Sequence, residues 1–176
     1  MSIILPGHTP PTSKTIRLDT AAGQPIDNEQ FFDISTFEIN QFPAYERWKD
    51  GRITRSGPTA KYNCHGMTFA SRRTGIWATA EIQKILTDDQ YVQVKPEDAM
   101  PGDVIIYFGD DGDAEHSGIV LTSPKDSQLR VPQVLSKWGK FSEFIHWANK
   151  SPYNFASVRY FRITTSNGIS STARSH

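Results

Sequence analysis

The chain has 176 residues, of which 37% are hydrophobic and 22% charged, and 19 basic residues balance 19 acidic ones. This length and composition predict one globular domain. The zero net charge argues against a nucleic-acid-binding protein that neutralises phosphates with a basic surplus. We expect no membrane span and no signal peptide, because no apolar run is long enough for either. The protein is therefore expected to be made in the cytoplasm and exported, if at all, by a non-classical route.

The first part of the chain predicts little regular structure. Residues 1–50 lack periodicity and are expected to form an irregular arm packed on the domain. Residues 51–61 are predicted to be a loop because Gly57-Pro58 breaks regular structure. From Cys64 onward apolar residues recur at spacings of three and four, which predicts two helical pieces separated at Gly75.

The rest of the chain predicts strands, in the order 91–94, 104–108, 117–122, 131–137 and 157–163. The fourth strand should begin at or after Pro132, since proline donates no ladder hydrogen bond. The serine- and threonine-rich residues 165–176 are expected to form a flexible tail. Helices followed by an antiparallel meander indicate an α+β domain over residues 51–164.

Cys64 is the only cysteine, which excludes an internal disulfide and a multi-cysteine zinc site. It falls where the loop gives way to the helical pattern, so its sulfur is expected at a helix N-terminus. The helix dipole and unpaired backbone N–H groups there favour a thiolate, and the Cys64 N–H can stabilise an oxyanion. The alternative is an unreactive buried residue.

His116 stands at the head of an apolar strand, with Gly118 two residues later. A single histidine is more often a structural residue. A thiol at a helix N-terminus and an imidazole on an adjacent strand, however, form the acid–base pair that thiol catalysis requires. His116 is therefore predicted to be the general base for Cys64.

A histidine base also needs a group that orients its second ring nitrogen. If the strands around residues 125–127 pair as a hairpin, the numbers of opposite residues sum to about 252. This register places Ser136 opposite His116, where its hydroxyl can accept the ring N–H. Ser136 is the predicted third catalytic residue and His146 is the rival. Lys137 is a poor candidate, because an ammonium group has no lone pair to offer.

Residues 110–115 are acidic but lack the twelve-residue frame of an EF-hand. They are predicted to be a solvated hairpin tip, with no metal and no cofactor bound by the protein. Their charge is expected to raise the pKa of His116 by stabilising the imidazolium.

Four blocks carry a family resemblance: Asn63–Gly66, Pro101–Phe108, His116–Val120 and Arg159–Arg162. Their order and spacing resemble the NlpC-type and CHAP-type cysteine amidases, in which a cysteine opens a helix and a histidine heads a later strand. The resemblance covers residues 60–163. It implies a papain-like fold, in which the helix bearing the cysteine packs on an antiparallel sheet.

Two positions depart from the family pattern. His65 stands where serine is usual, and Ser136 stands where histidine, asparagine or glutamine is common. Tyr62, His65 and Trp138 are expected to line the substrate cleft, although Trp138 fits a core position equally well.

The resemblance implies hydrolysis of amide bonds in peptidoglycan peptides without a cofactor. A small wall hydrolase is expected to be an antibacterial effector of a type VI secretion system, with an immunity protein and a carrier as partners, or a phage lysin. The alternatives are a deamidase or acyltransferase acting on a protein or lipid, and a non-catalytic binding module in which Cys64 only packs.

Overall fold

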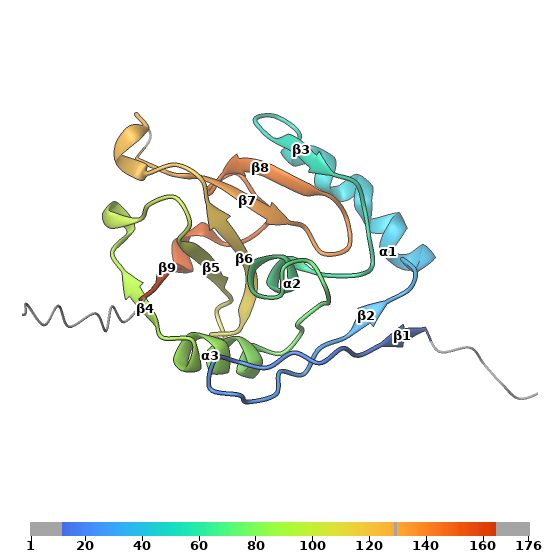
Figure 1. The fold of residues 1–176 in the computed structure, drawn as a ribbon. Coiled ribbons are helices and arrows are strands. Elements are labelled where there is room, and N and C mark those ends of the chain that lie inside the picture. The colour runs from blue at the N-terminus through green and yellow to red at the C-terminus, as the bar shows by residue number, and fades with distance from the viewer. Residues whose placement is uncertain (1–11, 129, 165–176) are drawn as a thin grey trace, which may run out of the picture.

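The computed structural model describes residues 12–128 and 130–164 as an α+β domain built on a seven-stranded antiparallel sheet (Figure 1). The strand order is β3-β8-β7-β6-β5-β9-β4. The strands are β3 (Ile53–Ser56), β4 (Tyr91–Val94), β5 (Val104–Phe108), β6 (Ala114–Val120), β7 (Gln133–Lys137), β8 (Glu143–Trp147) and β9 (Val158–Ile163). The predicted α+β class is confirmed. The tail predicted at 165–176 lies outside the described residues.

Within residues 12–128 and 130–164, three α-helices and four short 3₁₀ helices accompany the sheet. They are α1 (Thr36–Gln41), η1 (Phe42–Trp48), α2 (Cys64–Phe69), α3 (Thr79–Asp88), η2 (Pro96–Asp98), η3 (Pro124–Asp126) and η4 (Phe155–Ser157). α2 packs against β6 and β7, and α3 against β4 and β6. Among the described residues, no helix is both long and apolar enough to cross a membrane.

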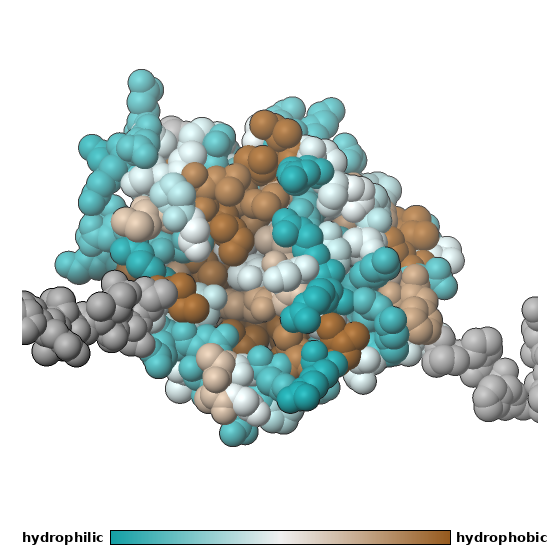
Figure 2. All heavy atoms as spheres, in the orientation of Figure 1, coloured by the Kyte–Doolittle hydropathy of each residue, from teal (hydrophilic) through white to brown (hydrophobic). Residues whose placement is uncertain are grey.

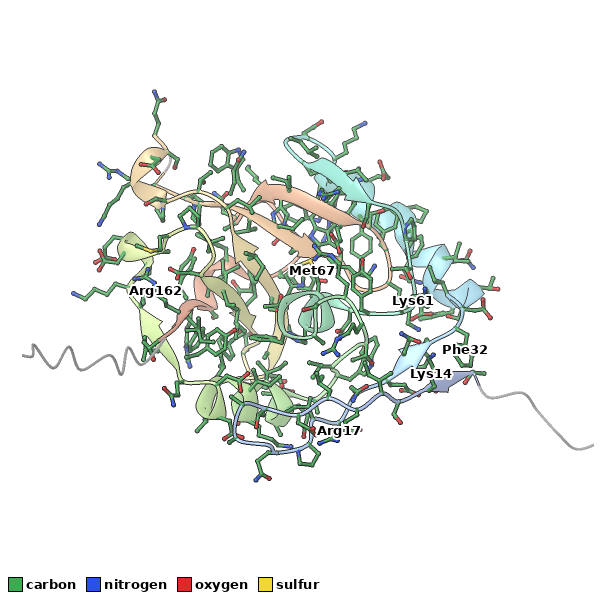
Figure 3. All side chains as sticks on the ribbon, viewed as in Figure 1. Lys14, Arg17, Phe32, Lys61, Met67 and Arg162 are labelled. Atoms are coloured by element: carbon green, nitrogen blue, oxygen red, sulfur yellow. The ribbon has the colours of Figure 1, made fainter. Side chains whose placement is uncertain are left out.

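The sheet carries hydrophobic residues on both faces. Every residue of β5 is buried, and alternate side chains of a strand point to opposite faces. Ile106 joins a cluster with Ile82 of α3, whereas Ile105 joins a second cluster with Val134 and Tyr160. Met67 of α2 is also buried and lies in the middle of the molecule (Figure 3). This two-sided packing fixes β5 and β6, which position the site.

The sequence predicted most of these strands. The bounds of β4 and β5 match the prediction, and β7 begins just after Pro132. The predicted loop at 51–61 is wrong at its centre, where β3 forms. β3 is an edge strand whose residues are mostly exposed, so it has no apolar alternation to reveal it.

The N-terminal segment packs along the domain. It holds the two-stranded pair β1 (Ser13–Lys14) and β2 (Gln30–Phe31). Between these strands, Ile26 joins the core beside α3, and the Asn28 amide donates to the carbonyl oxygen of Ile26 at 2.9 Å. The segment thus contributes to the hydrophobic core.

α1 leaves hydrophobic side chains in contact with solvent. A capping box formed by Ser35 and Glu38 starts this helix, yet none of its residues is buried. Phe37 is 74% exposed and Ile39 is 49% exposed. Figure 2 shows brown, hydrophobic atoms at the right-hand edge, where Figure 1 places α1.

Candidate active site

Cys64 is the first residue of α2, and the preceding Asn63 fixes the start of that helix. The Asn63 Oδ1 atom accepts hydrogen bonds from the backbone N–H groups of Gly66 at 2.9 Å and Ile76 at 3.1 Å. Its Nδ2 atom donates to the Ile76 carbonyl at 2.6 Å. One side chain thus caps the helix and ties it to the segment that leads to α3.

His116 lies on β6, opposite Tyr107 of β5. The pairing shifts by one residue beyond Tyr107, so Glu115 forms a bulge next to His116. The imidazole is fully buried and stacks on Tyr153, with ring centroids 3.7 Å apart and planes 6° from parallel. Neither ring nitrogen of His116 has a hydrogen-bond partner among the described residues.

The Cys64 thiol lies beside two imidazoles. Burial raises its pKa, but the adjacent His65 and His116 outweigh burial and hold the pKa well below the ordinary value. Charge is the larger effect of His116 on the thiol, and neither ring nitrogen of His116 meets a partner among the described residues in full hydrogen-bond geometry. Loosely aligned catalytic pairs are common before substrate binds. The site therefore favours the thiolate.

The pKa of His116 is lowered. Burial is the main cause, and the charge of His65 adds to it, while the Cys64 thiolate opposes both. The expectation that the acidic residues 110–115 raise this pKa is wrong. Asp110, Asp111 and Asp113 lie between β5 and β6, and Glu115 lies at the β6 bulge; all four side chains are exposed, so water screens their charge.

Ser136 makes no hydrogen bond to His116. The ladder pairs Ser136 with Gly118, so the predicted register is wrong by two residues. The Ser136 hydroxyl instead lies 2.8 Å from Nε2 of His146, and accepts the indole N–H of Trp138 at 3.1 Å. The predicted hydrogen bond from the second ring nitrogen of His116 to the Ser136 hydroxyl is absent.

His146 on β8 does not take that place either. Its Nδ1 atom donates to the carbonyl oxygen of Trp147 at 2.8 Å, and its Nε2 atom meets Ser136. Burial lowers its pKa to about 4, so it is neutral at physiological pH. Both nitrogens of His146 therefore have partners, and neither is available to His116. Stacking on Tyr153 orients the His116 ring instead.

The three side chains expected to line a substrate cleft are buried. Trp138 is fully buried in an aromatic cluster, and the Tyr62 hydroxyl donates to Oε1 of Glu143 at 2.8 Å. Both ring nitrogens of His65 are within 2.9 Å of protein oxygens. In this conformation these side chains pack inside the protein and do not line an open cleft.

A buried charged network on the other side of Tyr62 was missed by the sequence analysis. Glu143, 2% exposed at its side chain, accepts from Arg72 Nε at 2.7 Å and Nη2 at 3.0 Å. Lys137 is fully buried, donates to the Phe141 carbonyl at 2.6 Å, and has its pKa lowered to about 8 by burial. Glu143 and the Cys64 thiolate oppose that shift.

Glu143→Gln is expected to destabilise the fold by about 2–3 kcal/mol. Breaking a buried ion pair usually costs about 3–5 kcal/mol, and the half-exposed Arg72 reduces that cost. Urea unfolding measures the change. Glu46→Gln, which removes a largely exposed partner of Arg52, is the matched control and should cost under about 1 kcal/mol. Equal losses in the two variants would contradict a structural role for the network.

No group of three or more His, Cys, Asp or Glu side chains within residues 12–128 and 130–164 is arranged to hold a metal ion. Comparisons with protein-family models, curated proteins and solved structures found no match to this chain. The residues of the site are therefore the basis for a functional proposal.

Proposed function

We propose that this protein is a cysteine hydrolase that cleaves amide bonds in peptidoglycan peptides, with Cys64 as nucleophile and His116 as acid–base catalyst. One observation carries the proposal. The only cysteine has a depressed pKa and lies against a buried imidazole whose two nitrogens have no partner among the described residues. Burying an imidazole without hydrogen-bond partners costs free energy, and such unsatisfied buried groups are often functional.

The chemistry needs only these two side chains. The thiolate adds to the amide carbonyl, and the developing oxyanion lies near the Cys64 N–H, which has no acceptor within the helix. His116 takes the thiol proton of Cys64 as the thiolate forms, and gives that proton to the nitrogen as the C–N bond breaks. Neutral His116 then takes a proton from water as it attacks the thioester, and sulfur leaves as thiolate.

Access to the thiol requires movement. Cys64 is 5% exposed and His116 is fully buried. Tyr45 of η1 and Tyr153 lie within electrostatic range of the sulfur. A substrate reaches Cys64 only after side chains of this kind are displaced, so the structure represents a closed state.

The order of elements supports a papain-like arrangement, with the cysteine at a helix start and the histidine on a strand of the adjoining sheet. Combined with the resemblance to NlpC-type and CHAP-type amidases, this favours peptidoglycan stem peptides as substrate. We extend the proposal to an antibacterial effector exported by a type VI secretion system, with an immunity protein and a carrier as partners.

Expression in two compartments tests the proposal. The chain directed to the periplasm of a Gram-negative host is expected to lyse the cells, whereas cytoplasmic expression should leave growth unchanged, because the substrate lies outside the inner membrane. Cys64→Ala is the matched control and should be harmless in both compartments.

Mass spectrometry of digested peptidoglycan identifies the reaction. New amine and carboxyl termini support hydrolysis. A mass change without new termini would indicate deamidation or acyl transfer instead. A folded protein that alters no peptidoglycan and lyses no host would leave the binding module as the better hypothesis.

A further inference from the structure

His65, next to the proposed nucleophile, takes part in a closed set of hydrogen bonds that fixes its protonation state. Its Nδ1 atom is 2.9 Å from Ser117 Oγ, and its Nε2 atom is 2.9 Å from the carbonyl oxygen of Ala114. Ser117 Oγ is 3.0 Å from Thr68 Oγ1, which is 2.9 Å from the carbonyl oxygen of Cys64. Each of these contacts needs one proton.

The protons can be assigned in order. A carbonyl oxygen only accepts, so the Thr68 hydroxyl donates to the Cys64 carbonyl. Thr68 then has no proton left, and the Ser117 hydroxyl must donate to Thr68. Ser117 in turn has none for His65, so Nδ1 of His65 carries a proton. Nε2 must carry one as well, because the Ala114 carbonyl can only accept.

We infer that His65 is a resident imidazolium cation that holds Cys64 as the thiolate. A neutral His65 would leave one of these contacts without a proton, with two lone-pair-bearing atoms about 3 Å apart. The inference rests on the proposed function in one respect: the hydrolase uses the thiolate as its nucleophile. The positive charge of His65 itself follows from the hydrogen bonds alone. His65 is a positioning residue, because it acts through Cys64.

His146 shows that the proton count does not always give a cation. Its Nδ1 atom donates to Trp147, and the Ser136 hydroxyl is free to donate to its Nε2 atom because Ser136 accepts from Trp138. Every contact is satisfied with a single ring proton. The electrostatics agree with both assignments: His146 has a lowered pKa, whereas the Cys64 thiolate and the hydrogen bonds outweigh burial and raise the pKa of His65.

Other charged or titratable groups also face the thiol. Lys137 approaches from β7, but its ammonium group donates to the Phe141 carbonyl, and burial lowers its pKa to about 8. His116 approaches from β6, and the tyrosines of η1 and of the segment before η4 are neutral at physiological pH. His65 is therefore the group beside the sulfur whose hydrogen bonds require a positive charge.

Thr68→Val tests the inference with an isosteric change. Without the Thr68 hydroxyl, Ser117 can donate to Nδ1, and His65 can lose a proton without losing a hydrogen bond. The thiolate fraction at mildly acidic pH, measured by ultraviolet absorbance, is expected to fall roughly ten-fold, as for the loss of one charge-assisted hydrogen bond. Thr68→Ser keeps the hydroxyl and should titrate like the unmodified chain.

Nitrogen NMR of the histidine rings gives the direct readout. In the unmodified chain at neutral pH, both nitrogens of His65 should be protonated and only Nδ1 of His146. A singly protonated His65, or equal thiol titrations in Thr68→Val and Thr68→Ser, would overturn the inference. Neither measurement depends on turnover, so an inactive chain with a doubly protonated His65 would refute the hydrolase proposal and leave this one standing.

Discussion

Replacement of His116 by glutamine is expected to reduce the rate of peptidoglycan hydrolysis by about 10³-fold, while Cys64 stays ionised as the thiolate. General acid–base catalysis contributes roughly 10²–10⁴-fold to enzymatic rates, and glutamine can neither accept nor release the proton. The thiolate persists because His65 supplies the charge next to the sulfur. Glutamine is also long enough to keep part of the contact with Tyr153.

Two measurements on this variant separate its effects. Release of new peptide termini gives the rate, and the ultraviolet titration of Cys64 gives the thiolate fraction. Hydrolysis at the unmodified rate would remove His116 from the mechanism. A Cys64 thiol that titrates near its ordinary pKa of about 8.5 would mean that His116, and not His65, stabilises the thiolate. Cys64→Ala provides the zero-activity reference.

The parts of the site that the sequence could indicate are those set by local patterns. Cys64 follows a loop with Gly57-Pro58 and opens an apolar periodic segment, which marks a helix start. His116 precedes an apolar run, which marks a strand. Both signals depend on residues within a few positions, so the structure places Cys64 at the start of α2 and His116 on β6.

The partner of His116 could not be predicted in the same way. Register follows from turn geometry only when the connection is short. Residues 121–132 separate β6 from β7 and include η3, so a sum of residue numbers does not fix the pairing. The prediction placed Ser136 opposite His116, whereas the ladder places it opposite Gly118.

The buried polar groups were hidden for a different reason. Glu143 and Arg72 are 71 residues apart in sequence, and no local pattern links them. Arg72 reaches Glu143 from a left-handed backbone conformation with φ of 65°, which is uncommon for a residue other than glycine. β8 was missed because two of its buried side chains, Glu143 and His146, are polar. Only the folded sheet shows their partners.

Gly66→Ala is expected to destabilise the protein by about 3 kcal/mol or more and to remove the active site with it. A Cβ atom at Gly66 would lie 1.7 Å from the carbonyl oxygen of Thr74 and 3.1 Å from Cβ of Tyr62. Overpacking usually costs about 1–3 kcal/mol, and here the obstacle is backbone that cannot rotate away. The segment around Thr74 must therefore move off α2.

That movement breaks the contacts that hold Cys64 in place. Asn63 ties the start of α2 to Ile76, two residues beyond Thr74, so displacement of this segment releases the helix cap. Urea unfolding should show the loss of stability, and the Cys64 thiol should titrate closer to its ordinary pKa. Gly57→Ala is the matched control, because a Cβ there meets no atom within 4 Å and its backbone suits alanine. A Gly66→Ala protein as stable as Gly57→Ala would contradict the close packing of Thr74 on α2, and with it the geometry on which the proposed nucleophile depends.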